Sequence, residues 1–554
     1  MILPQFLACR QSRAQLFWLA LSLSVAAAYS VFALQEAFSS EWVVQDDARQ
    51  HVFWMLRFTN SELFPDDFIA NYFQTVAPAG YQWLYRGAIA LGFDPFVFNK
   101  LLPVGLNLIA AGYCFGTCLQ IFPVPAAAFT ATLLLSQSLG LTDAVVSGTP
   151  KAFIYPLFLA FLYYLLRRSL WPCLGAIALL GLFYPQMVLL AAAILTLRLV
   201  WRSHRQDWVM SVAGLAVAFL VLLPYALKTH QFEPVISVAQ ARSLPEFLPG
   251  GRSRFFYDND PAKFWLRGRG GVRLPSILTP VTNATGFLLL VLPQFPQRFP
   301  IVRQLQAKIL LQIVVASVGM FFAAHALLFR LHLPSRYTEH SLRMVMSIAS
   351  GIVLVILIES LWRWAKPGGR ALLAGCATIV MAIALAGYPR FVEKFPVTAY
   401  RVGEAPALYE FFQQQPPDSL IASLTDEGNN LPTFARRSIL VGSEYAIPYH
   451  WGYYRPFRER VLNLMAAQYS PNLQVVRDVI QKYGIDFWLL KPSDFTPEAL
   501  ADDPWLMQYQ PAANEAISHL QSGVPAILKT IPHCTVFQSK DLVVLDANCI
   551  RTAN

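Results

Sequence analysis

Charged residues are scarce in this sequence. Only 14% of its 554 residues are Asp, Glu, Lys or Arg, whereas 55% are hydrophobic. Because soluble proteins carry about 25% charged residues, this composition excludes an ordinary water-soluble chain of this length. Runs of about 20 mostly apolar residues, long enough to cross a bilayer, occur between residues 14 and 388 but not after them. The sequence therefore predicts a polytopic α-helical membrane protein with roughly eleven spanning helices and a small soluble α/β domain at its C-terminal end.

The motifs of several common enzyme classes are also missing. Residues 389–554 contain no Gly-x-Gly-x-x-Gly, no Walker loop and no Gly-x-Ser-x-Gly, which argues against a nucleotide-driven motor and a serine hydrolase. No Cys-x-x-Cys or Cys/His spacing suggests zinc. The formal net charge is +10, but the basic residues lie in short clusters between apolar runs and not along one soluble face. We therefore expect no binding to nucleic acid.

The basic clusters predict the orientation of the chain, because Lys and Arg near the ends of spans favour the cytoplasm. One convention places the N-terminus and every short basic connection inside, in a multi-pass protein of the plasma (inner) membrane. The apolar stretch 81–93 is interpreted as an interfacial helix, since counting it as a span would invert this pattern. The residues expected inside are Arg10, Arg13, Arg167, Arg168, Arg198, Arg202, Arg205, Arg298, Arg303, Lys308, Arg363, Lys366 and Arg370.

The same topology divides the chain into two domains. Residues 1–388 are expected to form the transmembrane domain, and residues 389–554 an extracytoplasmic α/β domain. One of the expected spans is the apolar run 281–297. The outer loops of the transmembrane domain are residues 35–97, 141–152, 228–280 and 330–340.

Acidic residues close to the outer membrane surface are the first candidates for chemistry. Asp46 and Asp47 follow the first span, and Asp143 lies in the next outer loop. A carboxylate held at a membrane face can act as a general base or bind a divalent cation, and Asp46 and Asp143 together could share a metal. Two plainer alternatives stay open. Asp46 and Asp47 could cap a helix, and Asp143 could be an ordinary loop residue.

The third outer loop is basic on the side where positive charge is disfavoured. Its glycines supply mobility, and its guanidinium groups match phosphate oxygens. This composition fits a flexible phosphate-binding lid, and it fits equally a solvated loop attracted to anionic lipid head groups. In the next outer loop Arg336, followed by Tyr337, could receive a phosphate leaving group, while His340 is typical of a structural hydrogen-bonding residue. The arginines of the third loop that could bind phosphate are Arg252, Arg254, Arg267 and Arg269.

The order and sidedness of these short motifs resemble the GT-C superfamily of polytopic glycosyltransferases, which includes protein O-mannosyltransferases, aminoarabinose transferases and the oligosaccharyltransferase catalytic subunit. Those enzymes have an acidic motif in a long first outer loop, often Asp-Glu-x-Arg-Tyr. Here it reads Asp46-Asp47-Ala48-Arg49-Gln50, so the first Asp and the Arg are kept. The sequence Trp-Trp-Asp-Tyr-Gly is absent, which argues against an oligosaccharyltransferase with an Asn acceptor.

The resemblance implies roles for these residues. Asp46 would be the essential carboxylate, with Asp47 and Asp143 as the other catalytic candidates. Substrate would be bound by Arg49, His51, Arg336 and Tyr337 together with the arginines of the third loop. The sequence alone does not decide between Asp46 and Asp47, because adjacent residues on a helix point about 100° apart.

The resemblance also implies a reaction. A sugar would move, with inversion, from a polyprenyl-phosphate or polyprenyl-diphosphate donor to a glycan, lipid or protein acceptor on the extracytoplasmic face, in contact with membrane lipids. A divalent metal, Mg²⁺ or Mn²⁺, would be optional, with Asp46 and Asp143 as its ligands. Two other functions remain alternatives. A lipid-linked glycan flippase or transporter would usually show internal repeats, which are not evident here, and a non-catalytic assembly protein would tolerate loss of Asp46.

Three features of the C-terminal region complete the analysis. Helix-like and strand-like stretches alternate, as in an α/β domain. The aromatic segment 445–455 is suited to stacking on sugar rings or, alternatively, to packing against the membrane domain. Cys534 and Cys549 flank a strand-like stretch and would form a disulfide if the domain is exported.

Overall fold

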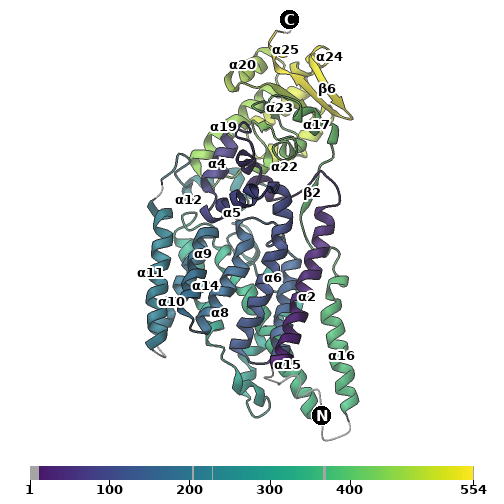
Figure 1. The fold of residues 1–554 in the computed structure, drawn as a ribbon. Coiled ribbons are helices and arrows are strands. Elements are labelled where there is room, and N and C mark those ends of the chain that lie inside the picture. Colours follow the sequence, from purple (N-terminus) through teal and green to yellow (C-terminus); the bar gives the residue numbers. More distant parts are fainter. Residues whose placement is uncertain (1–11, 202–204, 228, 366–369, 553–554) are drawn as a thin grey trace.

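A bundle of long apolar helices carries a mixed α/β domain at one end, in a computed structural model that describes residues 12–201, 205–227, 229–365 and 370–552 (Figure 1). Arg10, Arg202 and Lys366, which we expected at cytoplasmic ends, lie outside the described residues. The bundle consists of α2 (Ser12–Ala37), α6 (Pro95–Ile121), α7 (Pro125–Gly140), α8 (Ile154–Leu166), α9 (Leu170–Phe183), α10 (Gln186–Val200), α11 (Arg205–Leu227), α14 (Lys308–Ala326), α15 (Ser335–Ala365) and α16 (Ala371–Gly387).

Six helices of the described chain are long and apolar enough to cross a membrane, namely α2, α6, α11, α14, α15 and α16. In α15, 72% of the most apolar window is buried inside the protein, against 11% in α16, so α15 is the central helix and α16 a peripheral one. A Cβ atom on Gly351 of α15 would lie 2.4 Å from the backbone nitrogen of Ala131 in α7. Glycine therefore permits the close approach of these two helices. The chain is a multi-pass membrane protein.

The apolar run 281–297 differs from the spanning helix that we expected. It forms two 3₁₀ helices, η5 (Val281–Leu290) and η6 (Leu292–Gln294), with η5 packed along α15. Proline lacks a backbone N–H and fits poorly inside an α-helix. Pro280 directly precedes this run, and Pro293 and Pro296 interrupt it. A 3₁₀ helix rises about 2.0 Å per residue, so η5 is about 20 Å long, shorter than the ~30 Å hydrocarbon core.

The outer loops contain further short elements. Loop 35–97 forms β1 (Val43–Gln45), α3 (Ala48–His51), η1 (Phe53–Phe58), α4 (Phe68–Val76) and α5 (Ala79–Ala90), and α4 and α5 lie at the end of the bundle that carries the C-terminal domain (Figure 1). Loop 141–152 leads into η2 (Pro150–Phe153). Loop 228–280 forms α12 (Val238–Ser243), η3 (Pro245–Phe247), the π-helical turn η4 (Lys263–Arg267) and α13 (Leu274–Ile277), and η7 (Pro300–Gln304) precedes α14.

The C-terminal region is an α/β domain, as its sequence pattern predicts. Its sheet has the order β4-β3-β5-β7-β6, with β3 parallel to β4 and β5, and β7 antiparallel to β5 and β6. The strands are β3 (Leu420–Ser423), β4 (Ser438–Ile439), β5 (Phe487–Leu490), β6 (Thr535–Ser539) and β7 (Leu542–Asp546). The longer helices are α17 (Pro406–Gln413), α19 (Trp451–Gln468), α20 (Leu473–Tyr483) and α23 (Ala512–Ser522).

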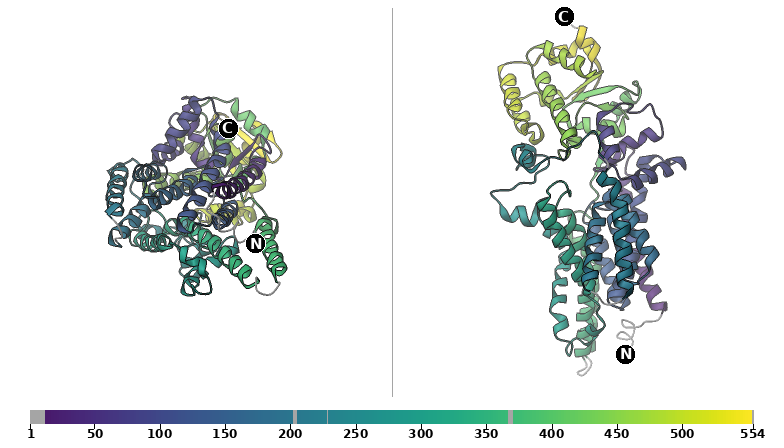
Figure 2. Two further views of the ribbon diagram at one scale, coloured as in Figure 1. Left: turned by 60° about the horizontal axis from the view of Figure 1, so that its bottom comes forward. Right: turned by 90° about the vertical axis from the view of Figure 1, so that its left-hand side faces the viewer.

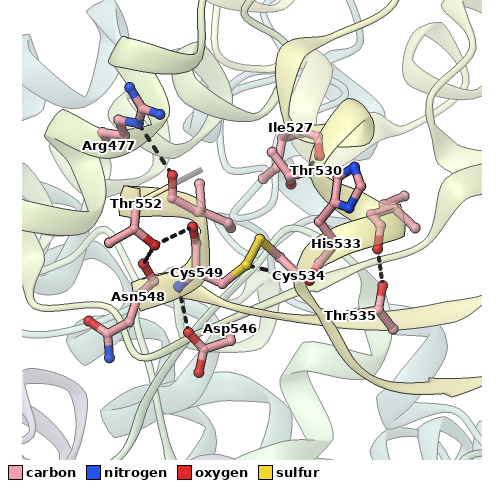
Figure 3. The surroundings of a disulfide bond; sticks show 12 residues. Arg477, Ile527, Thr530, His533, Cys534, Thr535, Asp546, Asn548, Cys549 and Thr552 are labelled. Atoms are coloured by element: carbon pink, nitrogen blue, oxygen red, sulfur yellow. Dashed lines mark hydrogen bonds between the residues drawn. A yellow bond between two sulfur atoms is a disulfide. The ribbon is translucent and has the colours of Figure 1, made fainter. Parts of the chain in front are cut away.

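Shorter helices complete this domain, and a disulfide ties its end. Helix η9 (Tyr388–Phe391) continues α16. The shorter helices of the domain are η10 (Asp426–Asn430), α18 (Leu431–Phe434), η11 (Ser443–Tyr445), η12 (Pro492–Asp494), α21 (Pro497–Ala501), α22 (Pro504–Met507), η13 (Ala526–Thr530), α24 (Ile531–Cys534) and α25 (Ala547–Thr552). Cys534 and Cys549 form the disulfide, next to a bond from the Cys549 backbone N–H to the Asp546 carboxylate (Figure 3). The pairing that we expected for an exported domain is therefore present.

The first outer loop and the C-terminal region hold each other in place. Strand β1 pairs antiparallel with β2 (Tyr400–Val402), although the two lie far apart in the sequence. Nearby, the rings of Tyr72 and Tyr453 stack with centroids 3.7 Å apart. Tyr445, Tyr453 and Tyr454 are fully buried, so these three tyrosines of the aromatic segment pack inside the protein and are not free to stack on sugars. Figure 2 shows the domain seated on one end of the bundle.

This contact region also contains a histidine that makes stability depend on pH. The Tyr72 hydroxyl lies 2.9 Å from His450 Nδ1. Burial, helped by the charge of nearby His230, lowers the pKa of His450 to about 4, below the value of about 6.5 in an unfolded chain. The unfolded state therefore binds the proton first, and the stabilisation present above pH ~6.5 is lost as the pH falls toward 4.

We expect the unfolding midpoint of the wild type in detergent to fall more steeply between pH 6.5 and 4 than that of His450→Gln. The Gln amide can still bond the Tyr72 hydroxyl but does not titrate in this range. Thermal unfolding at a series of pH values measures the difference, and two parallel curves would contradict the prediction.

Candidate functional site

Asp47 is held at the point where the first outer loop meets the helix bundle. It is the second residue after β1, and its backbone N–H donates to the side chain of Gln45 at 2.9 Å. Its carboxylate forms an ion pair with Lys151, a residue of η2 in the second outer loop. The same ammonium lies 2.8 Å from the Asp143 carboxylate. Two outer loops therefore converge on one lysine, and they bring Asp47 and Asp143 together.

The loop that carries Lys151 is firmly anchored. The side chain of Asn99 in α6 donates to the Ser147 carbonyl at 3.1 Å, and the Tyr81 hydroxyl of α5 donates to the Gly148 carbonyl at 3.2 Å. Gly148 has φ +60°, and a Cβ atom there would lie 2.8 Å from the backbone oxygen of Asn99. Only glycine fits this turn without strain, so the position of Lys151 is set by backbone contacts.

The charges around Asp47 keep it ionised. Burial alone would raise the pKa of this carboxyl group, but Lys151 and Arg336, joined in acid by protonated His51, outweigh burial and lower the pKa to about 2. His51 itself is neutral near pH 7, because burial lowers its pKa to about 4. The site therefore presents a carboxylate, able to accept a proton or a hydrogen bond, beside positive charge from two separate helices.

Arg336 stands in the first turn of α15, and its charge reaches Asp47. Within the described residues, its guanidinium has no hydrogen-bond or ion-pair partner, and its Nε atom is buried. A guanidinium in a partly buried site normally has an anionic partner, since an uncompensated charge is costly there. This arrangement is suited to receiving an anion, above all a phosphate, whose oxygens match the donor fork of arginine.

Asp46 has different partners from Asp47. Its carboxylate pairs with Arg49 and lies 2.9 Å from Nε of Arg401, which belongs to β2. The pairing of Asp46 with Asp143 that the sequence suggested is therefore replaced by a pairing of Asp47 with Asp143. The cause is the strand β1, whose contact with β2 turns Asp46 toward the C-terminal region.

Arg49 and Arg252 meet at one buried carboxylate, which we call the Glu444 junction. Glu444 Oε2 lies 3.1 Å from the guanidinium of Arg49 and 3.0 Å from that of Arg252. Arg49 also donates to the Asn430 side chain at 3.1 Å. The junction ties the first outer loop, the loop 228–280 and the C-terminal region together, so in this structure these two arginines make contacts within the protein.

The remaining candidates are spread around the site. Arg269 donates to the Tyr449 hydroxyl at 2.9 Å, whereas Arg254 and Arg267 are exposed. Tyr337 is fully buried, and its hydroxyl donates to the Leu331 carbonyl at 2.9 Å. Of the predicted site residues, the structure thus gathers Asp47, Asp143, His51 and Arg336, and it holds Asp46, Arg49 and Arg252 in a neighbouring cluster.

A buried polar network beside the site was not predicted. Arg343 of α15 is fully buried and donates to the Thr142 hydroxyl and the Tyr155 hydroxyl, each at 3.0 Å. One turn earlier, Glu339 lies 3.5 Å from the same guanidinium. An acid and a base four residues apart within an apolar helix are a signal that could have identified this pair.

A divalent metal site needs several oxygen or nitrogen ligands around one point. Among the described residues, no group of three or more His, Cys, Asp and Glu side chains is placed to hold a metal ion. Asp46 is engaged by two arginines, and Asp47 and Asp143 by one lysine. The carboxylates proposed as ligands from the sequence do not fit a bound Mg²⁺ or Mn²⁺ in this arrangement.

Comparison with known proteins places the fold. No protein-family model matches the sequence, and no curated protein matches it in sequence. The oligosaccharyltransferase of Archaeoglobus fulgidus, solved with a tethered acceptor peptide, matches 90% of this chain and 72% of its own at 11% identity and a TM-score of 0.55. The chain has the GT-C fold.

The oligosaccharyltransferase AglB from Archaeoglobus fulgidus, in complex with an inhibitory peptide and a dolichol-phosphate, gives the same coverage and TM-score at 12% identity. ArnT from Cupriavidus metallidurans, bound to undecaprenyl phosphate, matches 96% of this chain and 98% of its own at 14% identity and a TM-score of 0.48. The GT-C resemblance inferred from the outer-loop motifs is confirmed at the level of the fold.

Proposed function

We propose that this chain is a membrane glycosyltransferase that moves a sugar from a polyprenyl-phosphate or polyprenyl-diphosphate donor to a glycan, lipid or protein acceptor. One observation carries the proposal: an ionised Asp47 lies within electrostatic reach of Arg336, whose guanidinium has no hydrogen-bond or ion-pair partner among the residues that the structure describes. The GT-C fold supports it, since AglB of the same fold was solved with dolichol-phosphate. Transfer from a phosphate-linked donor requires a base beside a cationic group that can bind the phosphate.

The proposed reaction is a direct displacement. The acceptor hydroxyl oxygen forms a bond to the anomeric carbon while the bond from that carbon to the phosphate oxygen breaks, which inverts the configuration. The electron pair leaves with the phosphate, where Arg336 offsets the growing negative charge, and the hydroxyl proton passes to Asp47. A carboxylate of low pKa suffices, because a hydroxyl attacking an oxocarbenium-like carbon becomes strongly acidic as its new bond forms.

Membrane orientation is the second part of the proposal. We place the N-terminus in the cytoplasm and the C-terminal domain outside the plasma (inner) membrane. The basic clusters support this orientation, and so does the Cys534–Cys549 disulfide, because disulfides persist in oxidising compartments. Thiol labelling of the full chain in intact cells checks it: both cysteines should resist labelling until a reductant is added.

The test of the function is the loss of Arg336. In proteoliposomes supplied with a panel of polyprenyl-phosphate and polyprenyl-diphosphate sugars, we expect Arg336→Gln to lower the release of free polyprenyl phosphate or diphosphate by about 100-fold or more. Arg336→Lys should recover part of the rate, since Lys keeps the charge but not the paired donors.

Arg330→Gln is the matched control, because Arg330 lies six residues earlier and is exposed. Turnover by Arg336→Gln within twofold of this control would rule out the phosphate-binding role. If the wild type releases no carrier lipid from any donor of the panel, the transporter and assembly-protein alternatives take its place.

A further inference from the structure

Two carboxylates from separate outer loops meet at the ammonium of Lys151. Asp143 Oδ2 lies 2.8 Å from Nζ, and the Asp47 carboxylate is also in direct contact with it. The Lys151 side chain is 16% exposed, so the ammonium depends on these two partners for most of its stabilisation. Two facing carboxylates around one centre are a common way to hold a divalent cation, but a lysine nitrogen takes the centre here.

We propose that Lys151 is the permanent cation of this site and takes the place of a divalent metal between Asp47 and Asp143. The lysine neutralises the two carboxylates, and the protein therefore binds no divalent cation between them. The inference deepens the proposed function, on which its statement about turnover rests, whereas its statement about metal binding is independent of any reaction.

The surroundings of Lys151 oppose its replacement by a metal in the native chain. A bound metal would have to displace the ammonium from both carboxylates into a partly buried site, at the cost of an unpaired charge. The loop cannot move aside easily, because Gly148 and Ser147 are hydrogen-bonded to α5 and α6. The described residues also offer no third His, Cys, Asp or Glu side chain to complete a metal site.

The Lys151 ammonium differs from a bound metal in its hydrogen-bond donors and in its permanence. Its ammonium has three N–H donors, and the two carboxylates use two of them. The third remains for an oxygen of the sugar or the phosphate, and the charge stays in place without a metal supply. Lys151 is thus a positioning residue that orients Asp47 and has one donor left for the substrate.

The experiment is a Mn²⁺ titration of the full-length protein in detergent, followed by electron paramagnetic resonance. We expect no specific Mn²⁺ binding by the wild type. Lys151→Gln frees the two carboxylates and should bind Mn²⁺ at least about tenfold more tightly than the wild type. The double variant Lys151→Gln/Asp143→Asn is the matched control, and it should lose this binding again.

Two results would overturn the proposal. One is Mn²⁺ binding by the wild type that Asp143→Asn abolishes, a measurement that needs no Lys151 variant to fold. The other is a folded Lys151→Gln protein, shown by an unchanged elution volume and melting curve, that binds no more Mn²⁺ than the wild type.

Turnover gives an independent reading. Carrier-lipid release by the wild type should change less than twofold after treatment with EDTA, and Lys151→Arg should retain more activity than Lys151→Gln. Loss of turnover on chelation with recovery on adding Mn²⁺ would refute the role of Lys151 and leave the glycosyltransferase function standing. Absence of turnover with every donor would refute the function, while the Mn²⁺ titration would still decide the metal question.

Discussion

Replacing Asp47 by Asn will lower sugar transfer by about 100-fold or more, because the amide cannot take a proton from the acceptor hydroxyl. Asn also removes one of the two anionic partners of Lys151. The change in volume is minimal, so a folded protein is expected. Release of carrier lipid in proteoliposomes, measured at saturating donor, reports the loss in kcat.

Asp46→Asn is the control for this prediction, since it alters the neighbouring residue by the same chemical step. Asp46 faces Arg49 and Arg401 and not Lys151. We expect turnover to stay within about tenfold of the wild type, a smaller loss than general-base removal gives, and the melting temperature to fall. Equal losses of kcat in the two variants would show that the pair acts as one structural unit and would remove Asp47 from the role of base.

Arg343→Met will destabilise the protein by about 3–5 kcal/mol, the cost of breaking a buried charged network by removing one partner. Arg343 is fully buried, and its loss leaves the hydroxyls of Thr142 and Tyr155 without their donor. Glu339 would keep the hydrogen bond from the Ser276 hydroxyl, at 2.8 Å, and the contact to Arg273, at 3.5 Å, but would lose its buried cationic partner. Chemical or thermal unfolding in detergent measures the change.

The same helix supplies the control. Arg363 lies near the other end of α15, pairs with Glu359 and is 52% exposed. Arg363→Met should cost less than about 1 kcal/mol, as exposed ion pairs usually contribute little. If Arg343→Met and Arg363→Met shifted the unfolding midpoint equally, the buried network would not be a main source of stability.

Much of the fold could be predicted because hydropathy and periodicity are local signals. The run that becomes α6 ends at Ile121 with the next helix opening at Pro125, and apolar length alone indicates both. The strands β3 and β5 are short apolar runs bounded by polar turns, a pattern that is also visible in the local sequence. The run 281–297 shows the limit, since its hydropathy matches a span and only its prolines mark it as different.

The site could be predicted only in part, because its geometry depends on distant pairs. Residue type and sidedness were enough to name Asp46, Asp47, Asp143 and Arg336 as candidates, with Asp46 as the expected essential carboxylate. Nothing local distinguishes Asp46 from Asp47, since that choice follows from the pairing of β1 with β2. Lys151 was not predicted as a site residue for the same reason, because its role becomes visible only where two outer loops meet at its ammonium.

The pairing of β1 with β2 also sets the order in which the molecule can mature. The backbone N–H of Asp46 donates to the Ala399 carbonyl, and the Gln45 side chain reaches the Thr398 carbonyl, 353 residues later in the chain. A ribosome delivers the first outer loop long before it delivers these acceptors. Asp47 therefore gains its final surroundings only after the whole bundle and the segment that follows it have been synthesised. A nascent chain halted before Thr398 would carry every helix up to α16 and still lack the contacts that separate Asp46 from Asp47.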